Sequence, residues 1–390
     1  MNFIADRVRE LQGSAIRETF KLLSKPDIIS FAGGAPAPEL FPGAELSEIS
    51  QKILKDNAAV ALQYGVSEGY TPLREYVRAR MQANMHTGDD LIITAGGQQA
   101  IDLCAKSLVN EGDVVVAEIP SFIGGLNSFR SYNARLVGVA LEDDGMNLDK
   151  LEEILKKEKV KLVYTITTFQ NPSGITMSEQ KRKRLLALAQ QYDFYILEDN
   201  PYCELRFKGE DIPAIKSFDT EGRVIYAGSF SKTLSAGLRL GWCIAREDIL
   251  EKMIICKQVS DVHTAVLNQM IAYDFVSNYS FDAHIEKSRK LYGEKCALML
   301  SCMDKYFPDF CSFTRPEGGI FLWCTLPEHY DTGKLLKVCI ENKVAFVPGT
   351  SCAIDPTKPS HEFRLNYSLP SNEKIEKGIQ ILADVIKNYK

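Results

Sequence analysis

The 390-residue chain lacks the features that mark membrane and secreted proteins. It has no apolar run long enough to span a bilayer. Its first residues, M-N-F-I-A-D-R-V-R-E, carry charges where a secretory signal peptide needs an apolar core. Its ten cysteines are scattered and form no C-x-x-C pair. These absences favour a cytoplasmic protein with reduced thiols.

Motifs for metals, nucleotides and nucleic acids are also missing. Only five histidines are present and none belongs to an H-E-x-x-H pair, so we expect no metal site. No G-x-G-x-x-G follows a first strand, which argues against a Rossmann dehydrogenase. The net charge of −5 does not favour binding to nucleic acid or to anionic membranes.

The chain does contain the alternation of strands and helices that is typical of an α/β protein. Amphipathic stretches such as 98–109 and 179–192 separate short apolar runs, which indicates a mainly parallel sheet covered on both faces. The runs that predict strands are 91–94, 114–118, 136–141, 162–166, 194–198, 224–227 and 240–245.

The composition also predicts a division into three parts. After about residue 280, a long charged helix, three short strands and a terminal helix indicate a smaller α+β domain. We therefore expect an N-terminal segment at 1–43 that packs with the small domain, a large α/β domain at 44–285, and a small C-terminal domain at 286–390.

Serine, glycine and basic residues gather in the stretch Y-A-G-S-F-S-K-T-L-S-A-G-L-R-L-G-W at 226–242, which follows a strand. Such loops at the carboxyl ends of parallel strands are where α/β proteins bind ligands. Hydroxyl and backbone N–H groups suit a phosphate, and Arg239 could pair with it bidentately. Lys232 could attack a carbonyl if burial or cationic neighbours lower its pKa.

Two simpler interpretations of Lys232 remain open at this point. One is a degenerate Walker A loop, although that motif needs glycine where Ser231 stands. The other is an ordinary solvated loop lysine. Three further stretches favour a binding site. Two of them, N-P-S-G at 171–174 and E-D-N-P-Y at 198–202, each follow an apolar run. The third, T-A-G-G-Q-Q-A at 94–100, leads into a helix whose N-terminus suits a phosphate.

Five strings together resemble the class I/II aminotransferases, which are pyridoxal phosphate (PLP) enzymes of fold type I. The strings are S-F-A-G-G-A-P-A-P-E-L-F-P, Q-Y-G, Q-N-P-S-G, G-S-F-S-K and F-R-L-N-Y, and the resemblance covers nearly the whole chain. It is greatest for the subgroup of 2-aminoadipate, kynurenine and multi-substrate aromatic and branched-chain aminotransferases. It implies a homodimer with shared active sites that moves an amino group from an L-amino acid to a 2-oxo acid such as 2-oxoglutarate by a ping-pong mechanism.

The resemblance also implies a role for individual residues. Lys232 would carry the cofactor as a Schiff base, Asp199 would pair with its pyridine nitrogen, and Tyr202 would hydrogen-bond its phenolic oxygen. The other positions implied to bind the cofactor are Gly96, Gly97, Gln98, Phe122, Asn171, Ser229, Ser231 and Arg239, with Tyr64 reaching the neighbouring subunit. Those implied to bind the substrate carboxylate are Arg364, Gly34 and Asn171.

Two positions depart from the commoner pattern of the family. Gly97 stands where many relatives have serine, which removes one hydroxyl from the phosphate site. Phe122 stands where tyrosine is usual, which keeps an aromatic ring to stack on the cofactor but loses a hydroxyl. Neither change removes a group that the chemistry requires.

The substrate range and the exact reaction class are the least constrained expectations. Arg17 lies in an amphipathic segment that would cover the active site, where it would meet the distal carboxylate of an acidic substrate; alternatively it is an exposed helix arginine. A PLP-dependent β-lyase would have the same cofactor site. A PLP-sensing transcription regulator needs an added DNA-binding domain, for which we expect no room before the G-G-A-P-A-P string.

Overall fold

The computed structural model describes residues 3–9 and 27–389. Arg17 and the segment around it lie outside the described residues, and only the short helix α1 (Asp6–Arg9) is defined before residue 27. Within the described ranges, no helix is both long and apolar enough to cross a membrane.

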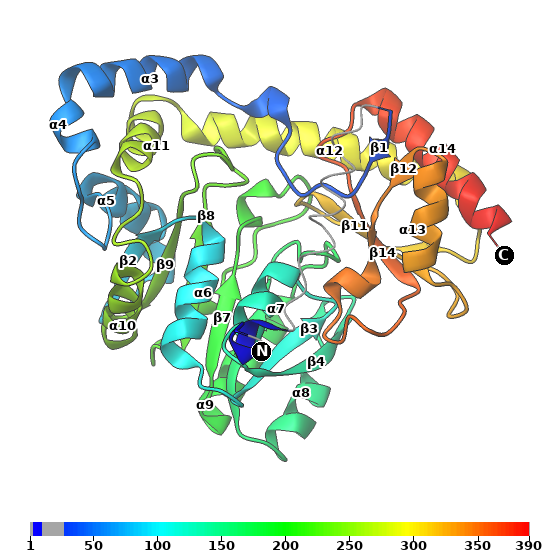
Figure 1. Cartoon of the computed structure of the whole chain (residues 1–390), viewed down its shortest axis with the longest axis horizontal. Coiled ribbons are helices and arrows are strands. Elements are labelled where there is room, and N and C mark those ends of the chain that lie inside the picture. Colours follow the sequence, from blue (N-terminus) through cyan, green and yellow to red (C-terminus); the bar gives the residue numbers. More distant parts are fainter. Residues whose placement is uncertain (1–2, 10–26, 390) are drawn as a thin grey trace.

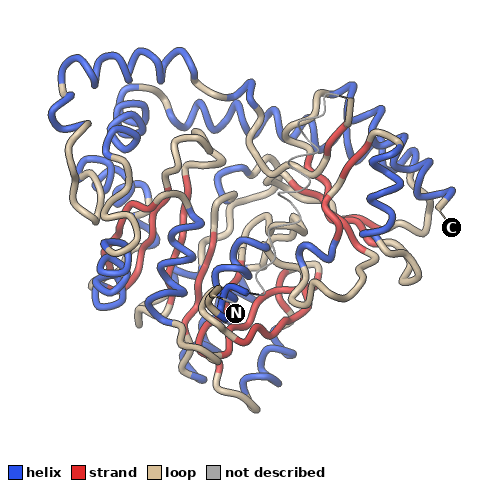
Figure 2. The backbone as a smooth tube through the Cα atoms, viewed as in Figure 1, coloured by secondary structure: helices blue, strands red, loops and turns tan. Residues whose placement is uncertain are grey.

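An eight-stranded sheet forms the centre of the large part of the molecule (Figures 1 and 2). Its strands are β2 (Asp89–Thr94), β3 (Val114–Ile119), β4 (Arg135–Glu142), β5 (Gly145–Met146), β6 (Val160–Thr165), β7 (Tyr195–Asp199), β8 (Val224–Ser229) and β9 (Gly241–Arg246), in the order β2-β9-β8-β7-β6-β3-β4-β5. Strands β4, β3, β6, β7 and β8 run parallel, which confirms the predicted mainly parallel sheet.

The antiparallel strand β9 is the feature of this sheet that the strand pattern alone did not reveal. It pairs antiparallel with both β8 and β2. Only residues 230–240 connect β8 to β9, and a parallel return would need a longer crossover. The chain therefore turns back directly, and this short turn carries Lys232.

Helices cover both faces of the large sheet because alternate residues of its inner strands are buried on each side. On one face α6 (Gly97–Leu108), α7 (Ile123–Arg130) and α10 (Glu247–Gln258) pack on the strands. The opposite face is covered near β6 and β7 by α8 (Leu148–Leu155) and α9 (Glu179–Tyr192). Near β2 and β9 it is covered by α3 (Gly43–Asp56), α4 (Ala58–Ala61), α5 (Thr71–Arg80) and α11 (Val266–Asn278).

A second, antiparallel sheet forms the centre of the C-terminal part. Its order is β10 (Ser312–Phe313), β11 (Phe321–Thr325), β14 (Glu362–Asn366) and β13 (Val347–Pro348). Helices α12 (Phe281–Tyr306), α13 (Thr332–Glu341) and α14 (Asn372–Asn388) accompany it. The short helical turns of the chain are η1 (Pro38–Leu40), η2 (Gln82–Asn84), η3 (Cys203–Leu205), η4 (Ile215–Phe218) and η5 (Gly349–Cys352).

The N-terminal segment lies against this second part. Strand β1 (Ile29–Ser30) pairs in parallel with β12 (Val344–Ala345), and Figure 1 shows the two beside α14. The helix α12 runs without a break across residues 285 and 286, where the sequence placed the boundary between the large and small domains. The division of the chain into three parts stays a prediction.

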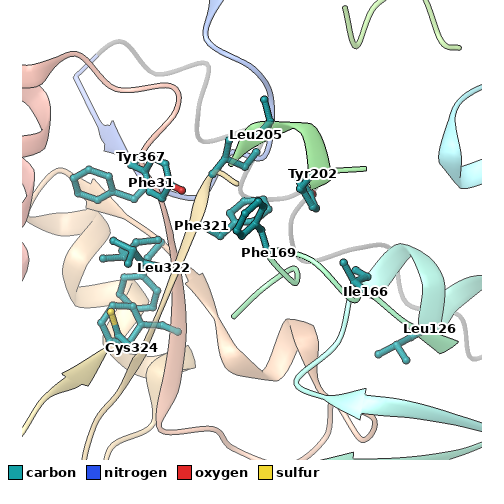
Figure 3. Close-up of a cluster of buried hydrophobic side chains, with 14 of the residues drawn as sticks. Phe31, Leu126, Ile166, Phe169, Tyr202, Leu205, Phe321, Leu322, Cys324 and Tyr367 are labelled. Carbon is teal, nitrogen blue, oxygen red and sulfur yellow. The ribbon is translucent and has the colours of Figure 1, made fainter. Parts of the chain in front are cut away.

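A continuous apolar cluster joins the two sheets. Figure 3 shows Phe169, from the loop after β6, beside Phe321 of β11. The backbone of Gly318 approaches the Phe169 ring so closely that a Cβ there would lie 2.1 Å from Phe169 Cζ. Glycine is therefore required at this contact, since a side chain would separate the two sheets. The contact matters because the candidate site lies between them.

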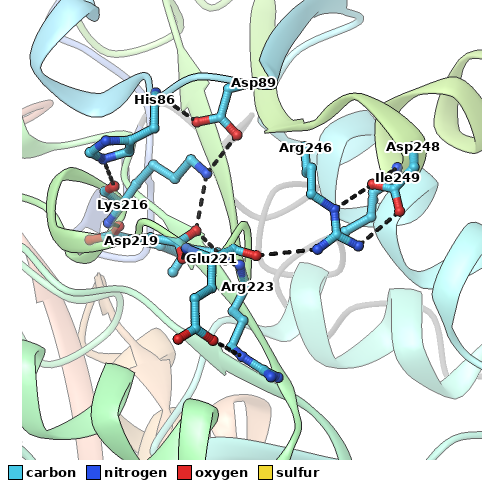
Figure 4. Close-up of polar contacts among 11 residues, drawn as sticks. His86, Asp89, Lys216, Asp219, Glu221, Arg223, Arg246, Asp248 and Ile249 are labelled. Atoms are coloured by element: carbon cyan, nitrogen blue, oxygen red, sulfur yellow. Dashed lines mark hydrogen bonds and ion pairs between the residues drawn. The ribbon is translucent and has the colours of Figure 1, made fainter.

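A buried ion cluster fastens η4 to the large sheet (Figure 4). Lys216 is fully buried, and its Nζ lies 3.0 Å from Asp89 Oδ1 and 3.1 Å from Asp219 Oδ2. Burial alone would raise the pKa of Asp219, but the Lys216 charge and the backbone N–H groups of Val224 and Arg223 hold it below its ordinary value. The cluster thus connects the starts of β2 and β8.

We expect Lys216→Met to destabilise the fold by about 3–5 kcal/mol, because it leaves two buried carboxylates without their cation. Chemical denaturation at neutral pH measures this change. The control is Lys150→Met, which removes an exposed lysine paired with Glu153 and should change the midpoint little. Equal effects of the two substitutions would contradict a special role for the buried cluster.

Candidate functional site

A cavity of about 440 Å³ lies between the carboxyl ends of the parallel strands and the second sheet. The loops after β6, β7 and β8 form one wall, and side chains of β11 and β14 form another. Among the described residues, all those predicted from the sequence to form the site line this cavity, except Gly96 and Tyr64. The site is thus assembled from parts of the chain that are far apart in sequence.

Lys232 stands in the turn between β8 and β9 and points into the cavity. Its Nζ donates a hydrogen bond to the carbonyl oxygen of Gly34 at 2.6 Å. Burial lowers the pKa of Lys232 to about 8, helped by the positive charges of Arg364 and Arg239, while the Asp199 carboxylate opposes this shift. An amine with such a pKa is partly neutral near pH 8 and can act as a nucleophile or a base.

Asp199 ends strand β7 and, within the part of the chain that the structure describes, is the one acidic residue that lines the cavity. It is 4% exposed, and burial raises its pKa to about 7. A hydrogen bond from the Tyr164 hydroxyl, at 2.8 Å from Oδ2, and the Lys232 charge act in the opposite direction. A cation placed beside Asp199 would keep this carboxylate ionised.

A cup suited to an oxyanion lies at the N-terminus of α6. Helix α6 begins at Gly97, so its first backbone N–H groups have no partner inside the helix. Ser229 and Ser231 bring hydroxyl groups, and Ser231 N–H also donates to Ser229 Oγ at 3.0 Å. The Arg239 guanidinium completes the cup and donates to the carbonyl oxygen of Ala95 at 3.2 Å.

Gly96 contributes to this cup without lining the cavity. Its φ is +80°, and a Cβ at this position would lie 2.7 Å from an Arg239 guanidinium nitrogen. Glycine therefore allows both the turn into α6 and the close approach of the arginine. This is a direct structural reason for the G-G pair that the sequence pointed to.

Arg364 of β14 forms the cavity wall opposite the oxyanion cup. Its Nη1 donates to Asn171 Oδ1 at 2.9 Å and its Nη2 donates to the carbonyl oxygen of Ala32 at 2.9 Å. The guanidinium lies 4.1 Å from the centroid of the Phe321 ring, and its Nε has no hydrogen-bond partner. A buried arginine with a free N–H and fixed orientation suits a carboxylate.

Asn171 links this arginine to the tyrosine predicted to bind the cofactor. The Asn171 amide Nδ2 donates to Tyr202 Oη at 3.4 Å, and Tyr202 is almost fully buried. Burial raises the pKa of Tyr202, so its hydroxyl stays protonated and can donate a hydrogen bond at neutral pH.

Two predicted residues have surroundings that the sequence did not indicate. The Gln98 side-chain amide donates to Ser128 Oγ at 2.9 Å and to the carbonyl oxygen of Gly124 at 3.0 Å, so it is engaged with α7. Tyr64 is 81% exposed and lies edge-on to His263, outside the cavity. Within a single chain, Tyr64 therefore does not reach the oxyanion cup.

Several residues of the site were missed by sequence reasoning. Phe321 lines the cavity and orders Arg364, and Tyr164 bonds to Asp199 from outside the cavity. Their sequence neighbourhoods read as ordinary buried strands, so no local signal distinguished them. The remaining lining residues that were missed are Ala35, Ile101, Ile166, Pro201 and Ala236.

The cavity contains groups for two anions and one carbonyl. Among the described lining residues, three cations, Lys232, Arg239 and Arg364, face one carboxylate, so the cavity favours negatively charged ligands. A phosphate fits the cup at Arg239, and a carboxylate fits Arg364. Lys232 stands between them with a lowered pKa. These donors fit pyridoxal phosphate together with an amino acid.

Comparisons with known proteins agree with this arrangement. The family model for class I and II aminotransferases matches residues 39–382. The chain is 43% identical to an aromatic-amino-acid aminotransferase of Thermococcus litoralis, over 99% of this chain and 94% of that protein. It is 38% identical to a 2-aminoadipate transaminase of Thermus thermophilus, over 97% of this chain and 94% of that protein.

The crystal structure of kynurenine aminotransferase from Pyrococcus horikoshii, in complex with PMP, superposes with a TM-score of 0.95 at 41% identity. The match covers 99% of this chain and 97% of the other. Since the family match and these relatives span nearly the whole sequence, the chain belongs to the class I and II aminotransferases and is a pyridoxal-phosphate-dependent transaminase of fold type I.

Proposed function

We propose that this transaminase moves the amino group of an aromatic, branched-chain or 2-aminoadipate-like L-amino acid to a 2-oxo acid, with 2-oxoglutarate as the first acceptor to test, by a ping-pong mechanism. The observation that carries the proposal is the presence of Lys232, Asp199 and Arg364 in one cavity. The names of the relatives from Thermococcus, Thermus and Pyrococcus support this substrate range.

Bound pyridoxal phosphate supplies an electron sink for the charge left when the α-proton of the amino acid is removed. In our proposal, the cup of Ser229, Ser231, Arg239 and the α6 N-terminus binds the phosphate. Asp199 holds a proton on the pyridine nitrogen, Tyr202 and Asn171 bind the phenolic oxygen, and Phe122 stacks on the ring. These roles are supported by the positions of the residues around one cavity.

Two residues act on the substrate in this proposal. Arg364 binds the α-carboxylate, with Gly34 and Asn171 beside it, and so orients the amino acid. With its amine free and neutral, Lys232 would take the α-proton of the amino acid that Arg364 holds and would later return it. General acid–base catalysis by a positioned lysine requires a lowered pKa, which burial produces at Lys232 with help from the charges of Arg364 and Arg239.

We expect Lys232→Ala to lower the transamination rate by about 1000-fold or more while pyridoxal phosphate still binds, because both the covalent attachment and the acid–base group are lost. Borohydride reduction followed by peptide mapping of the wild type should label Lys232. The exposed Lys183 of α9, changed to alanine, serves as the control and should keep full activity.

The same assay separates transamination from β-elimination. A transaminase given an amino acid alone converts its cofactor to the pyridoxamine form and releases one equivalent of 2-oxo acid. Continued release of ammonia and 2-oxo acid without an acceptor would contradict the proposal. Label on a different lysine would contradict the role of Lys232.

We expect Arg364→Lys to raise KM for all amino acids by roughly 10–100-fold, because lysine cannot form the bidentate pair with a carboxylate. Arg17→Ala provides the contrast. If Arg17 binds the distal carboxylate, Arg17→Ala should lower kcat/KM for 2-aminoadipate and glutamate and leave kcat/KM for leucine and phenylalanine nearly unchanged. Steady-state kinetics on these four substrates tests both residues. A loss of equal size on all four with Arg17→Ala would show that it only supports its segment.

We also propose a cytoplasmic homodimer with shared active sites. The ten cysteines are free thiols, which suits a reducing compartment. Exposed apolar side chains lie around Tyr64, the residue that would reach the oxyanion cup of the partner subunit. They are Leu62, Tyr64, Val66, Val259 and Val262, all at least 48% exposed. Such a patch is typical of a surface that another protein covers.

We expect hybrid dimers of Lys232→Ala and Tyr64→Phe chains to regain activity, because one of the two sites then has both Lys232 and a tyrosine at position 64. The two variants are refolded together and compared with each variant refolded alone. Light scattering should give a monodisperse dimer. Activity of the mixture no higher than the average of the two separate preparations would place Tyr64 outside the partner's site.

A further inference from the structure

Tyr164 is a buried tyrosine of β6 whose hydroxyl binds the active-site carboxylate from behind. It is fully buried and does not line the cavity. Its Oη donates a hydrogen bond to Asp199 Oδ2 at 2.8 Å. Strand β6 lies directly beside β7, which ends at Asp199, so the two side chains meet across neighbouring parallel strands. The second oxygen, Oδ1, is left to accept a bond from a ligand.

The Tyr164 ring is held in this orientation by α7. A Cβ on Gly125 would lie 2.6 Å from the ring and 2.8 Å from its hydroxyl oxygen, so the helix backbone packs directly on the tyrosine. Phe129 of the same helix lies with its ring centroid 5.6 Å away. Two helical residues, one of them necessarily glycine, thus prevent the hydroxyl from turning away from Asp199.

The hydroxyl acts on the charge of Asp199. Burial raises the pKa of Tyr164 well above its ordinary value, as does the nearby Asp199 charge, so Tyr164 stays protonated and can donate at neutral pH. The other titratable groups around Asp199 are Lys232, Tyr202 and Glu118. Of these neighbours, Tyr164 is the one that donates a hydrogen bond to the carboxylate, and such a bond favours its ionised form.

We propose that Tyr164 is a positioning residue that keeps Asp199 ionised and aimed at the pyridine nitrogen of the cofactor. This inference rests on the role proposed above for Asp199. Without the hydroxyl, Asp199 becomes a stronger base and takes a larger share of the proton that it holds on the pyridine nitrogen. The electron-withdrawing power available for α-proton removal then falls, although the substrate contacts of Arg364 are unchanged.

The test compares Tyr164→Phe with a matched control, Tyr226→Phe. Tyr226 is a buried tyrosine of β8, the strand on the other side of β7. Its hydroxyl lies 3.9 Å from Cys203 Sγ rather than beside Asp199. The main measurement is an absorbance titration of the bound cofactor, which reports the pKa of the nitrogen that joins it to Lys232. We expect Tyr164→Phe to raise this pKa by about half a unit or more, because a less protonated ring withdraws fewer electrons. Tyr226→Phe should leave it unchanged.

Kinetics give a second measurement. We expect Tyr164→Phe to lower kcat of the amino-acid half-reaction about tenfold and to leave KM within about twofold, as for an effect realised mainly after binding. A titration and kcat that match the wild type, with only a lower thermal midpoint, would overturn the inference and leave Tyr164 as a packing residue.

An Asp199→Asn background separates this inference from the role proposed for Asp199. Asp199→Asn should itself shift the titration, and adding Tyr164→Phe should cause no further shift, because the carboxylate through which Tyr164 acts is absent. A further shift would overturn the inference. If Asp199→Asn leaves the titration unchanged, both the role proposed for Asp199 and the inference about Tyr164 are wrong. If Asp199→Asn shifts the titration but Tyr164→Phe does not, only the inference about Tyr164 is wrong.

Discussion

The structure of the site depends on an imbalance of charge inside one partly closed cavity. In the described parts of the chain that line it, Lys232, Arg239 and Arg364 face a single carboxylate, Asp199. Burial disfavours the charged form of Lys232, and the positive charges of Arg364 and Arg239 repel it, so both effects lower the pKa of Lys232. Two anions, a phosphate and an amino-acid carboxylate, relieve this repulsion. The protein therefore binds its ligands with the same charges that prepare the lysine for chemistry.

The fold keeps these charges apart at fixed positions. Lys232 and Arg239 occupy the short turn that reverses the chain between β8 and β9, and Asp199 ends the neighbouring strand β7. Arg364 comes from the second sheet, so the distance between the two sheets sets its position. The contact of Gly318 with Phe169 determines how closely these sheets approach. A small residue far from the chemistry thus helps to set the width of the cavity.

A second layer of side chains orders the groups that line the cavity. Tyr164 holds Asp199 from behind, Phe321 lies under the Arg364 guanidinium, and Asn171 connects Arg364 to Tyr202. Each buried polar side chain in this set makes at least one hydrogen bond, which limits the cost of burying it. The groups are therefore ordered before any ligand arrives, and such preorganisation favours catalysis.

The sequence by itself determined the type and order of the elements, because their apolar periodicity depends only on neighbouring residues. The seven apolar runs of the large sheet all became strands, and the polar strings after them all lie at its carboxyl edge. Short strings that resemble those of the class I/II aminotransferases also pointed to Lys232, Asp199 and Arg364.

Only the tertiary structure decided the contacts between elements. Tyr164 meets Asp199 across 35 positions of sequence, and Phe321 meets Arg364 through the pairing of β11 with β14. The engagement of the Gln98 side chain with α7 and the exposure of Tyr64 were likewise invisible in the sequence. Periodicity shows which face of a strand is buried but not which side chain lies opposite, since that depends on strand register and on the packing of the two sheets.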